Sequence, residues 1–261
     1  MPFKFLARPE MQQAVRTAKS GTSRPLQKVA HGQRVLAQSS WQTGLAHARR
    51  NEWDAALRAF QRATQADPGD PVFALNLARA LLALHRLDDA ALEAARAFNL
   101  DPHNAVACAF TAHCLMEGKR FRDAARCLRS LPADVERGHD YHYTLARALQ
   151  LSGQPREAVD AYMQALSLRL SDANTHYQLG LCLNDLSMKA EAAQCFQTAL
   201  QLGVGAQHEL GVRALLSYFE REACSWQNAS EGLAQLQAAL DRLPDDAAVP
   251  TAPFAHVTLL D

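Results

Sequence analysis

The sequence lacks any long apolar run, and no segment reaches the ~18 consecutive apolar residues that suggest a membrane-spanning helix. Glycine and proline are scarce, with 12 and 11 among 261 residues, which argues against an all-β chain with many tight turns. A net charge is also missing, because 27 lysines and arginines balance 27 aspartates and glutamates, whereas nucleic-acid-binding proteins are usually basic. Hydrophobic residues make up 48% of the chain, which excludes wholesale disorder. We therefore expect a soluble, helix-rich protein with no transmembrane segment and no nucleic-acid partner.

Motifs that carry catalytic or metal chemistry are absent as well. The sequence has no Gly-rich phosphate loop, no GxSxG, no HExxH, no CxxC pair and no paired carboxylates. We therefore expect no catalytic residues, no metal site and no cofactor in this chain. The N-terminal segment lacks the apolar core of a secretory signal, which predicts a cytoplasmic location and reduced thiols. The six cysteines are Cys108, Cys114, Cys127, Cys182, Cys195 and Cys224.

The charge balance hides an asymmetry at the N-terminal end. Residues 1–36 carry a local charge of +6, and the remainder carries −6. Pro2, Pro9, Gly21 and Pro25 interrupt this segment too often for a long helix. We expect residues 1–36 to form a basic N-terminal arm or a capping helix, and an alternative role is docking to an acidic partner or a membrane surface.

A set of small and apolar residues recurs at a constant interval along the chain. In each set an alanine is followed four residues later by an apolar residue, and three residues after that by another. Five copies in one register indicate an internal repeat with a period of about 34 residues. Such a repeat is the strongest indication of the fold class in this sequence. The five sets are Ala56–Phe60–Ala63, Ala90–Ala94–Ala97, Ala124–Leu128–Leu131, Ala158–Tyr162–Ala165 and Ala192–Phe196–Ala199.

A second small-residue series has the same period and precedes the first within each copy. Small side chains let two helices approach closely, while the large residue of the first series fills the space beside them. Asp67-Pro68 and Asp101-Pro102 predict helix ends, because a residue before proline is disfavoured in the α region. We expect copies that begin at 37, 71, 105, 139 and 173, each with two helices of about 12–15 residues that stack on the next copy. The second series is Gly44, Ala78, Ala112, Ala146 and Gly180.

These copies resemble tetratricopeptide repeats, whose pattern is W-x2-L-G-x2-Y, then A-x3-F, then P. The third and fourth copies lack the closing proline and hold Glu136 and Leu170 instead. The resemblance implies an all-α, right-handed superhelical solenoid of about five repeats over residues 37–206, plus a capping helix pair. The fifth copy carries the pattern in His176, Leu179, Gly180, Leu183, Ala192 and Phe196, and the second in Ala74, Leu77, Ala78, Leu81, Ala90, Ala94, Ala97 and Pro102.

The segment after the repeats has helical apolar spacing over 207–222 and a second helix over 227–242. We expect residues 207–242 to form a degenerate capping repeat in which Trp226 covers the end of the core, with residues 243–261 as a tail or linker. The segment also resembles the linker between repeats and catalytic domain in bacterial O-linked N-acetylglucosamine transferase-like proteins. The catalytic domain of that family has no counterpart here. The matching residues are Cys224, Trp226, Pro253, Phe254 and Asp261.

The tetratricopeptide resemblance implies a binding groove lined by the first helix of each repeat. Aromatic residues and arginine are common at binding hot spots, and amides can hold the backbone of an extended peptide. The alternative is that these side chains only pack or meet solvent. We predict a protein or peptide partner at Trp41, Asn76, Arg79, Phe110, His113, Tyr143, Arg147, Tyr177 and Gln178.

Two families of ligand are disfavoured by departures from related patterns. The glycosyltransferases carry a row of asparagines at one repeat position, and only Asn76 matches it here; the clamp of chaperone-binding repeats is absent.

His142 and His176 share one repeat position, which predicts packing rather than metal binding. Cys114 and Cys182 lie two periods apart, as do Cys127 and Cys195, which suits inert core thiols. The leading hypothesis is a non-catalytic protein-binding module, and the alternative is the recognition region of a glycosyltransferase whose catalytic domain lies outside this chain.

Overall fold

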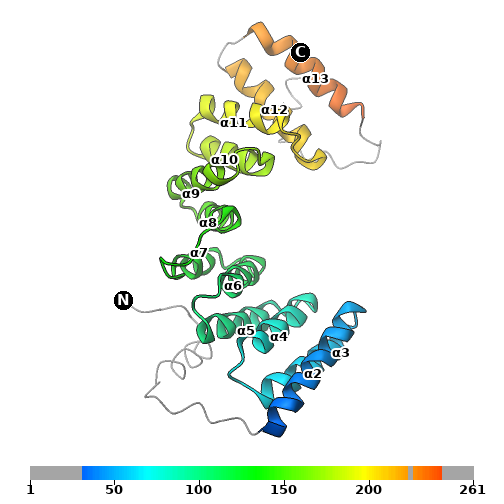
Figure 1. Cartoon of the computed structure of the whole chain (residues 1–261). Coiled ribbons are helices and arrows are strands. Elements are labelled where there is room, and N and C mark those ends of the chain that lie inside the picture. Colours follow the sequence, from blue (N-terminus) through cyan, green and yellow to red (C-terminus); the bar gives the residue numbers. More distant parts are fainter. Residues whose placement is uncertain (1–30, 223–225, 243–261) are drawn as a thin grey trace. The chain divides into compact units, whose positions relative to one another are not determined.

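The computed structural model describes residues 31–222 and 226–242, and within these ranges the chain forms twelve α-helices and no strand (Figure 1). The prediction of an all-α helical repeat fold is therefore confirmed. The chain divides into two compact units, residues 1–137 and 138–261. The first unit contains α2 (His31–Arg49), α3 (Trp53–Ala66), α4 (Pro71–Ala83), α5 (Leu87–Leu100), α6 (Ala105–Glu117) and α7 (Phe121–Arg129). The second contains α8 (His139–Leu151), α9 (Pro155–Leu168), α10 (Ala173–Asp185), α11 (Lys189–Gln201), α12 (Ala206–Glu222) and α13 (Trp226–Leu240).

Helix pairs follow the predicted period. The helices α4, α6, α8 and α10 begin at residues 71, 105, 139 and 173, while α2 already begins at His31, before residue 37. Within each unit the two helices of a pair contact each other, and the second helix contacts the first helix of the next pair. The predicted arm therefore overlaps α2, and residues 1–30 lie outside the described residues.

Three of the first helices start with the same N-cap at the same repeat position. The side chains of Asp70, Asn104 and Asp172 accept hydrogen bonds from the main-chain N–H of Val72, Ala107 and Thr175, at 2.7, 3.0 and 2.8 Å. Each cap satisfies one of the N–H groups that a helix leaves unpaired at its start, which stabilises the helix by about 1 kcal/mol. Periodic caps thus explain why these helices begin at equivalent positions of their repeats.

The turn inside each repeat recurs with the same period and uses a left-handed backbone. Its residues are Asn51, His85, Lys119, Gly153 and Ser187, with φ between 56° and 80°. In each turn the following N–H reaches back to a carbonyl five residues earlier, for example from Arg86 to Leu81 at 2.9 Å. This pattern is a Schellman motif, in which glycine is the least strained choice for the left-handed residue. Four of these five positions hold another residue.

The two small-residue series form the contacts between paired helices. All fifteen residues of the first series are buried, and so are all five of the second. A Cβ added to Gly180 would lie 2.6 Å from Cε1 of Phe196, which is closer than side chains tolerate. The interpretation of these residues as close-contact positions agrees with the structure.

The second helix of the third repeat is shorter than predicted. The helix α7 spans 9 residues and ends at Arg129, although Leu131 keeps its predicted buried position at 3% exposure. The cause is Pro132, which disfavours the α region at Leu131 and offers no N–H for a helical hydrogen bond. The expectation of two long helices is therefore wrong for this copy.

The last helix pair packs through a small apolar cluster. Leu210 and Ala214 of α12 contact Leu236 of α13, and Ala239 and Leu240 pack against them. The two helices span Ala206–Glu222 and Trp226–Leu240, in the region where we predicted a capping repeat. The side chain of Trp226 and the whole of Cys224 lie outside the described residues, as does the tail 243–261.

Candidate partner-binding faces

In the first unit, the predicted face of α4 and α6 carries an exposed cation beside an aromatic ring. The guanidinium carbon of Arg79 lies 5.7 Å from the centroid of the Phe110 ring, which joins adjacent repeats. Phe110 is half-buried and its ring centroid is 6.3 Å from that of His113, whose side chain is exposed. Val72 and Val106, near the starts of the same two helices, are 45% and 59% exposed. Cationic, aromatic and aliphatic groups are therefore all accessible on these helices.

The other two predicted residues of this unit point into the packing. Trp41 packs with Phe73 at a centroid distance of 6.1 Å and joins a small core cluster. Its indole N–H is buried and finds no acceptor among the described residues. Asn76 is 7% exposed, and its Nδ2 donates to the Val72 carbonyl at 2.8 Å. A partner contact at either residue stays a prediction.

In the second unit, Tyr143 and Arg147 form a cluster with two residues outside the predicted set. Tyr143 stacks on His139 at 6.0 Å and meets the ring of the fully buried Tyr162 edge-on at 6.1 Å. Burial raises the pKa of Tyr162, and the positive charge of Arg147 opposes that rise. The Tyr162 hydroxyl donates to Gln150 Oε1 at 2.8 Å. Tyr162 is thus a core anchor, and Arg147 and Tyr143 are the half-buried groups above it.

Tyr177 lies on α10, the first helix of the next repeat after α8. Its ring stacks on His208 of α12 at 4.5 Å and lies 6.2 Å from the ring of Phe196. Burial raises the pKa of the Tyr177 phenol, so the side chain is neutral and can donate its O–H at physiological pH. Gln178 beside it is half-buried. The face therefore pairs aromatic rings with an amide.

The cations of both faces lack the carboxylate partners that several other arginines in the described part of the chain have. Among the described residues, no carboxylate pairs with Arg79 or Arg147. By contrast, Arg86 and Arg120 are held by carboxylates at 2.6 and 2.7 Å. An arginine that has no carboxylate partner within the protein can pair with a carboxylate of a ligand without first breaking an existing ion pair.

Sequence reasoning missed four residues of these faces, Val72, Val106, His139 and His208. Three of them carried a usable signal, since Val72, Val106 and His208 share the second position of their repeats. No group of three or more metal-ligating side chains is found within the described residues.

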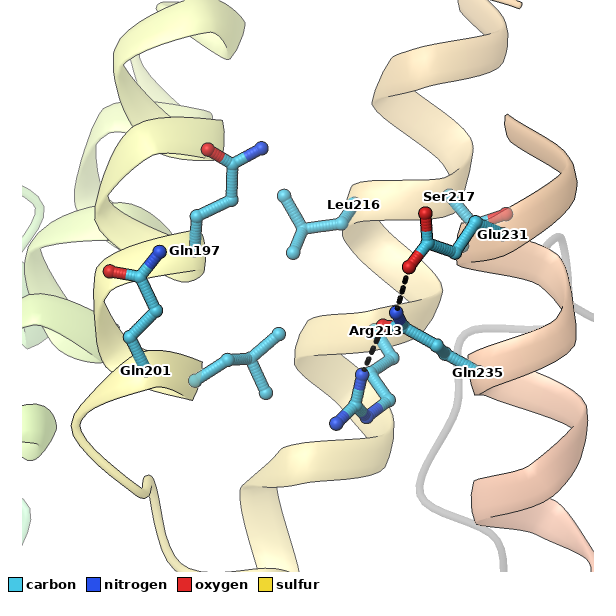
Figure 2. A pocket seen from close by; sticks show the side chains of 9 residues that line it. Gln197, Gln201, Arg213, Leu216, Ser217, Glu231 and Gln235 are labelled. Carbon is cyan, nitrogen blue, oxygen red and sulfur yellow. Dashed lines mark hydrogen bonds between the residues drawn. The ribbon is translucent and has the colours of Figure 1, made fainter. Parts of the chain in front are cut away.

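A separate cleft of about 490 Å³ opens in the second unit between α11, α12 and α13. Figure 2 shows Gln197 and Gln201 on one wall and Arg213, Glu231 and Gln235 on the other. Arg213 donates to Gln235 at 2.8 Å and to Glu209 at 3.0 Å, and Gln235 donates to Glu231 at 3.1 Å. Arg213 thus already has a carboxylate partner in Glu209, and Glu231 has an amide partner in Gln235, whereas no carboxylate among the described residues pairs with Arg79 or Arg147.

Fold and repeat geometry define a helical-repeat protein built from paired helices. Sequence models of the tetratricopeptide repeat match residues 48–97 and 143–206, one stretch in each unit. The chain therefore contains tetratricopeptide repeats, as the repeat pattern predicted. No curated protein sequence matches the chain.

Solved structures of similar fold support the same assignment. MamA from Desulfovibrio magneticus RS-1 is 20% identical, with a TM-score of 0.59 over 64% of this chain and 94% of that one. The pilF protein of Pseudomonas aeruginosa is 19% identical, with a TM-score of 0.61 over 81% and 95%. YrrB, described as a TPR protein with an unusual peptide-binding site, is 22% identical, with a TM-score of 0.58 over 72% and 94%. At these identities the likeness shows the fold.

The second resemblance, to a glycosyltransferase linker, finds no support. None of these neighbours carries such a linker in its description. Five residues suggested this resemblance. Four of them, and the side chain of the fifth, Trp226, lie outside the described residues.

In the part of the chain that the structure describes, no helix is both long and apolar enough to cross a bilayer.

Proposed function

We propose that this chain is a protein-interaction module that binds polypeptide segments on the first-helix faces of its two units. Arg79, Phe110 and His113 would contact the ligand in the first unit, and Tyr143, Arg147, Tyr177 and Gln178 in the second. The single observation that carries this proposal is the exposed Arg79 guanidinium on the Phe110 ring, with no carboxylate partner among the described residues.

The chemistry of the first face favours a segment with acidic and apolar residues. A carboxylate of the ligand would pair with Arg79, and its apolar side chains would cover Phe110 and the exposed Val72 and Val106. Arginine on an aromatic face keeps its N–H edge available for such a carboxylate. Since Arg79 is exposed, salt should screen the interaction and weaken binding.

The face of the second unit has two tyrosines, and its predicted residues are half-buried, whereas Arg79 and His113 of the first unit are exposed. Tyr143 and Tyr177 each rest on a buried ring of the following helix, Tyr162 and Phe196. Rigid rings supply contact area at low entropic cost, and the amide of Gln178 offers a donor and an acceptor for peptide backbone. The peptide-binding site named for YrrB adds support from a protein of similar fold.

A peptide library displayed on phage and selected against the whole chain tests this proposal. We expect enrichment of sequences that combine acidic with apolar residues, and loss of that enrichment with Arg79→Glu. Arg58→Glu is the matched control, because Arg58 is an exposed residue of α3 outside the predicted face. Equal enrichment by both variants, or no enrichment by the native chain, would contradict the proposal.

The glycosyltransferase alternative and the cytoplasmic location remain predictions. The first requires a catalytic domain encoded next to this segment, and a transfer assay with the longer protein would decide it. The basic segment 1–36 likewise keeps its predicted acidic partner or membrane surface. No observation on the described residues favours these over peptide binding by the helices.

A further inference from the structure

Two cysteines of the third repeat face each other across the α6–α7 pair. The Cys108 thiol lies 3.6 Å from the Cys127 carbonyl oxygen, and the Cys127 thiol lies 3.8 Å from the Cys108 carbonyl oxygen. Each sulfur therefore reaches the main chain of the other residue, and both side chains are buried. The 19-residue separation of this pair is not a repeat period, so periodicity alone does not reveal it.

The surroundings make one of these thiols a better nucleophile than the other buried cysteines. A hydrogen bond with the Cys127 thiol lowers the pKa of Cys108, burial opposes this, and the nearby Arg137 guanidinium lowers it further. The same hydrogen bond and burial raise the pKa of Cys127. Burial raises the pKa of Cys114 to about 12 and that of Cys182 to about 11. Thiolate character is what makes cysteine reactive.

We propose that Cys108 and Cys127 form a redox-sensitive dithiol that a peroxide converts into a disulfide between α6 and α7. The Cys108 thiolate attacks one oxygen of hydrogen peroxide, the O–O bond breaks, and Cys108 sulfenic acid and water form after proton transfer. The Cys127 sulfur then attacks Cys108 Sγ, an S–S bond forms, and the hydroxyl leaves as a second water with the Cys127 proton. Two thiols are oxidised by two electrons, and one peroxide is reduced to two waters.

The position of the pair links this chemistry to the proposed binding face. Cys108 lies on α6, the helix that also carries Phe110 and His113. A covalent bond to α7 would hold α6 against its partner helix and restrict the adjustment of that face to a ligand. This consequence rests on the proposed function, whereas disulfide formation itself does not.

The test is a peptide map of the whole chain after treatment with hydrogen peroxide, digested without reduction and read by mass spectrometry. Trypsin leaves Cys108 and Cys114 in one peptide, so Cys114→Ala is used to place the bond. We expect a Cys108–Cys127 linkage in both the native chain and Cys114→Ala, and its loss in Cys108→Ser. Cys127 that stays unlinked, or that links equally to Cys114, would overturn the inference.

A second measurement avoids both oxidant and substitution. Phenylarsine oxide binds two neighbouring thiols, with two S–As bonds formed and one water released. Intact mass of the native chain should show one equivalent bound, and digestion should place it on the peptides of Cys108 and Cys127. Binding at other cysteines, or none at all, would show that the two sulfurs do not come together.

Discussion

Gly44 lies so close to Phe60 that a Cβ on residue 44 would stand 2.5 Å from Cε1 of the ring. The same relationship holds four repeats later between Gly180 and Phe196. The corresponding residues are Ala78 and Ala94 in the second repeat and Ala146 and Tyr162 in the fourth, and all four are fully buried. At Gly44 and Gly180 the phenyl ring of the second helix occupies the space that a Cβ would need.

Alanine at these glycines should therefore destabilise the protein. Gly44→Ala and Gly180→Ala should each lower the free energy of unfolding by about 1–3 kcal/mol, since the phenyl ring or the helix must shift to admit a methyl group. Urea unfolding followed by circular dichroism measures this. Gly32→Ala is the control, because a Cβ there meets nothing within 4 Å. Equal stability of all three variants would refute the close contact.

The left-handed turns give a second prediction. Gly153→Ala should lower the free energy of unfolding by about 1 kcal/mol. Gly153 has φ +80° and a Cβ there would meet nothing within 4 Å, so the loss is purely conformational. His85→Gly, at the equivalent position with φ 57°, should change stability in the opposite direction, by up to about 1 kcal/mol. Thermal unfolding of the two variants decides this. Gly118→Ala serves as the control, because Gly118 has φ −76°.

Much of the fold was predictable because the same contact between paired helices recurs in every repeat and requires a small residue each time. The regular spacing of small residues predicted the starts of α4, α6, α8 and α10, since a helix contact that requires alanine or glycine leaves a visible pattern. Most of the left-handed residues were not predictable, because only Gly153 and Asn51 are residue types that favour this conformation. At Asn51, His85, Lys119 and Ser187 the helix pair imposes the conformation, and neighbouring contacts offset its strain.

The site was less predictable than the fold. Assigning groove positions by repeat number places Asn76 with Arg79, yet Asn76 is bonded to its own helix at Val72 whereas Arg79 is exposed. Pairings such as Tyr177 with His208 depend on side chains from the next repeat. A single repeat position carries no information on that neighbour.

Alkaline pH should weaken the fold through buried thiols. Because the folded pKa of Cys114 is about 12 and its usual value is 9.0, the unfolded chain ionises first. The contribution of Cys114 to stability is thus complete below pH 9 and is lost as pH rises toward 12. The melting temperature should fall over this range, and less steeply in Cys114→Ala. Parallel curves for the two proteins would contradict the role of this thiol.

Arg79 and Phe110 should be energetically coupled. A double-mutant cycle with Arg79→Gln and Phe110→Leu should give a coupling of about 0.5–1 kcal/mol in unfolding free energy, the usual range for an exposed cation on a ring. Chemical denaturation of the four proteins supplies the values. Strict additivity would show that the two side chains do not interact in solution.

Binding to the two first-helix faces is tested most directly by the affinity of a selected acidic and apolar peptide, labelled and measured by fluorescence anisotropy. The double variant Arg79→Glu with Arg147→Glu should lose at least about tenfold in affinity, and the native affinity should fall as salt rises. Arg58→Glu with Arg156→Glu removes two exposed arginines from α3 and α9 instead and should bind like the native chain. All four changes should leave the helical spectrum intact. Native affinity in the first double variant, together with loss of binding when residues 1–30 are deleted, would contradict the account and assign the interaction to the basic N-terminal segment.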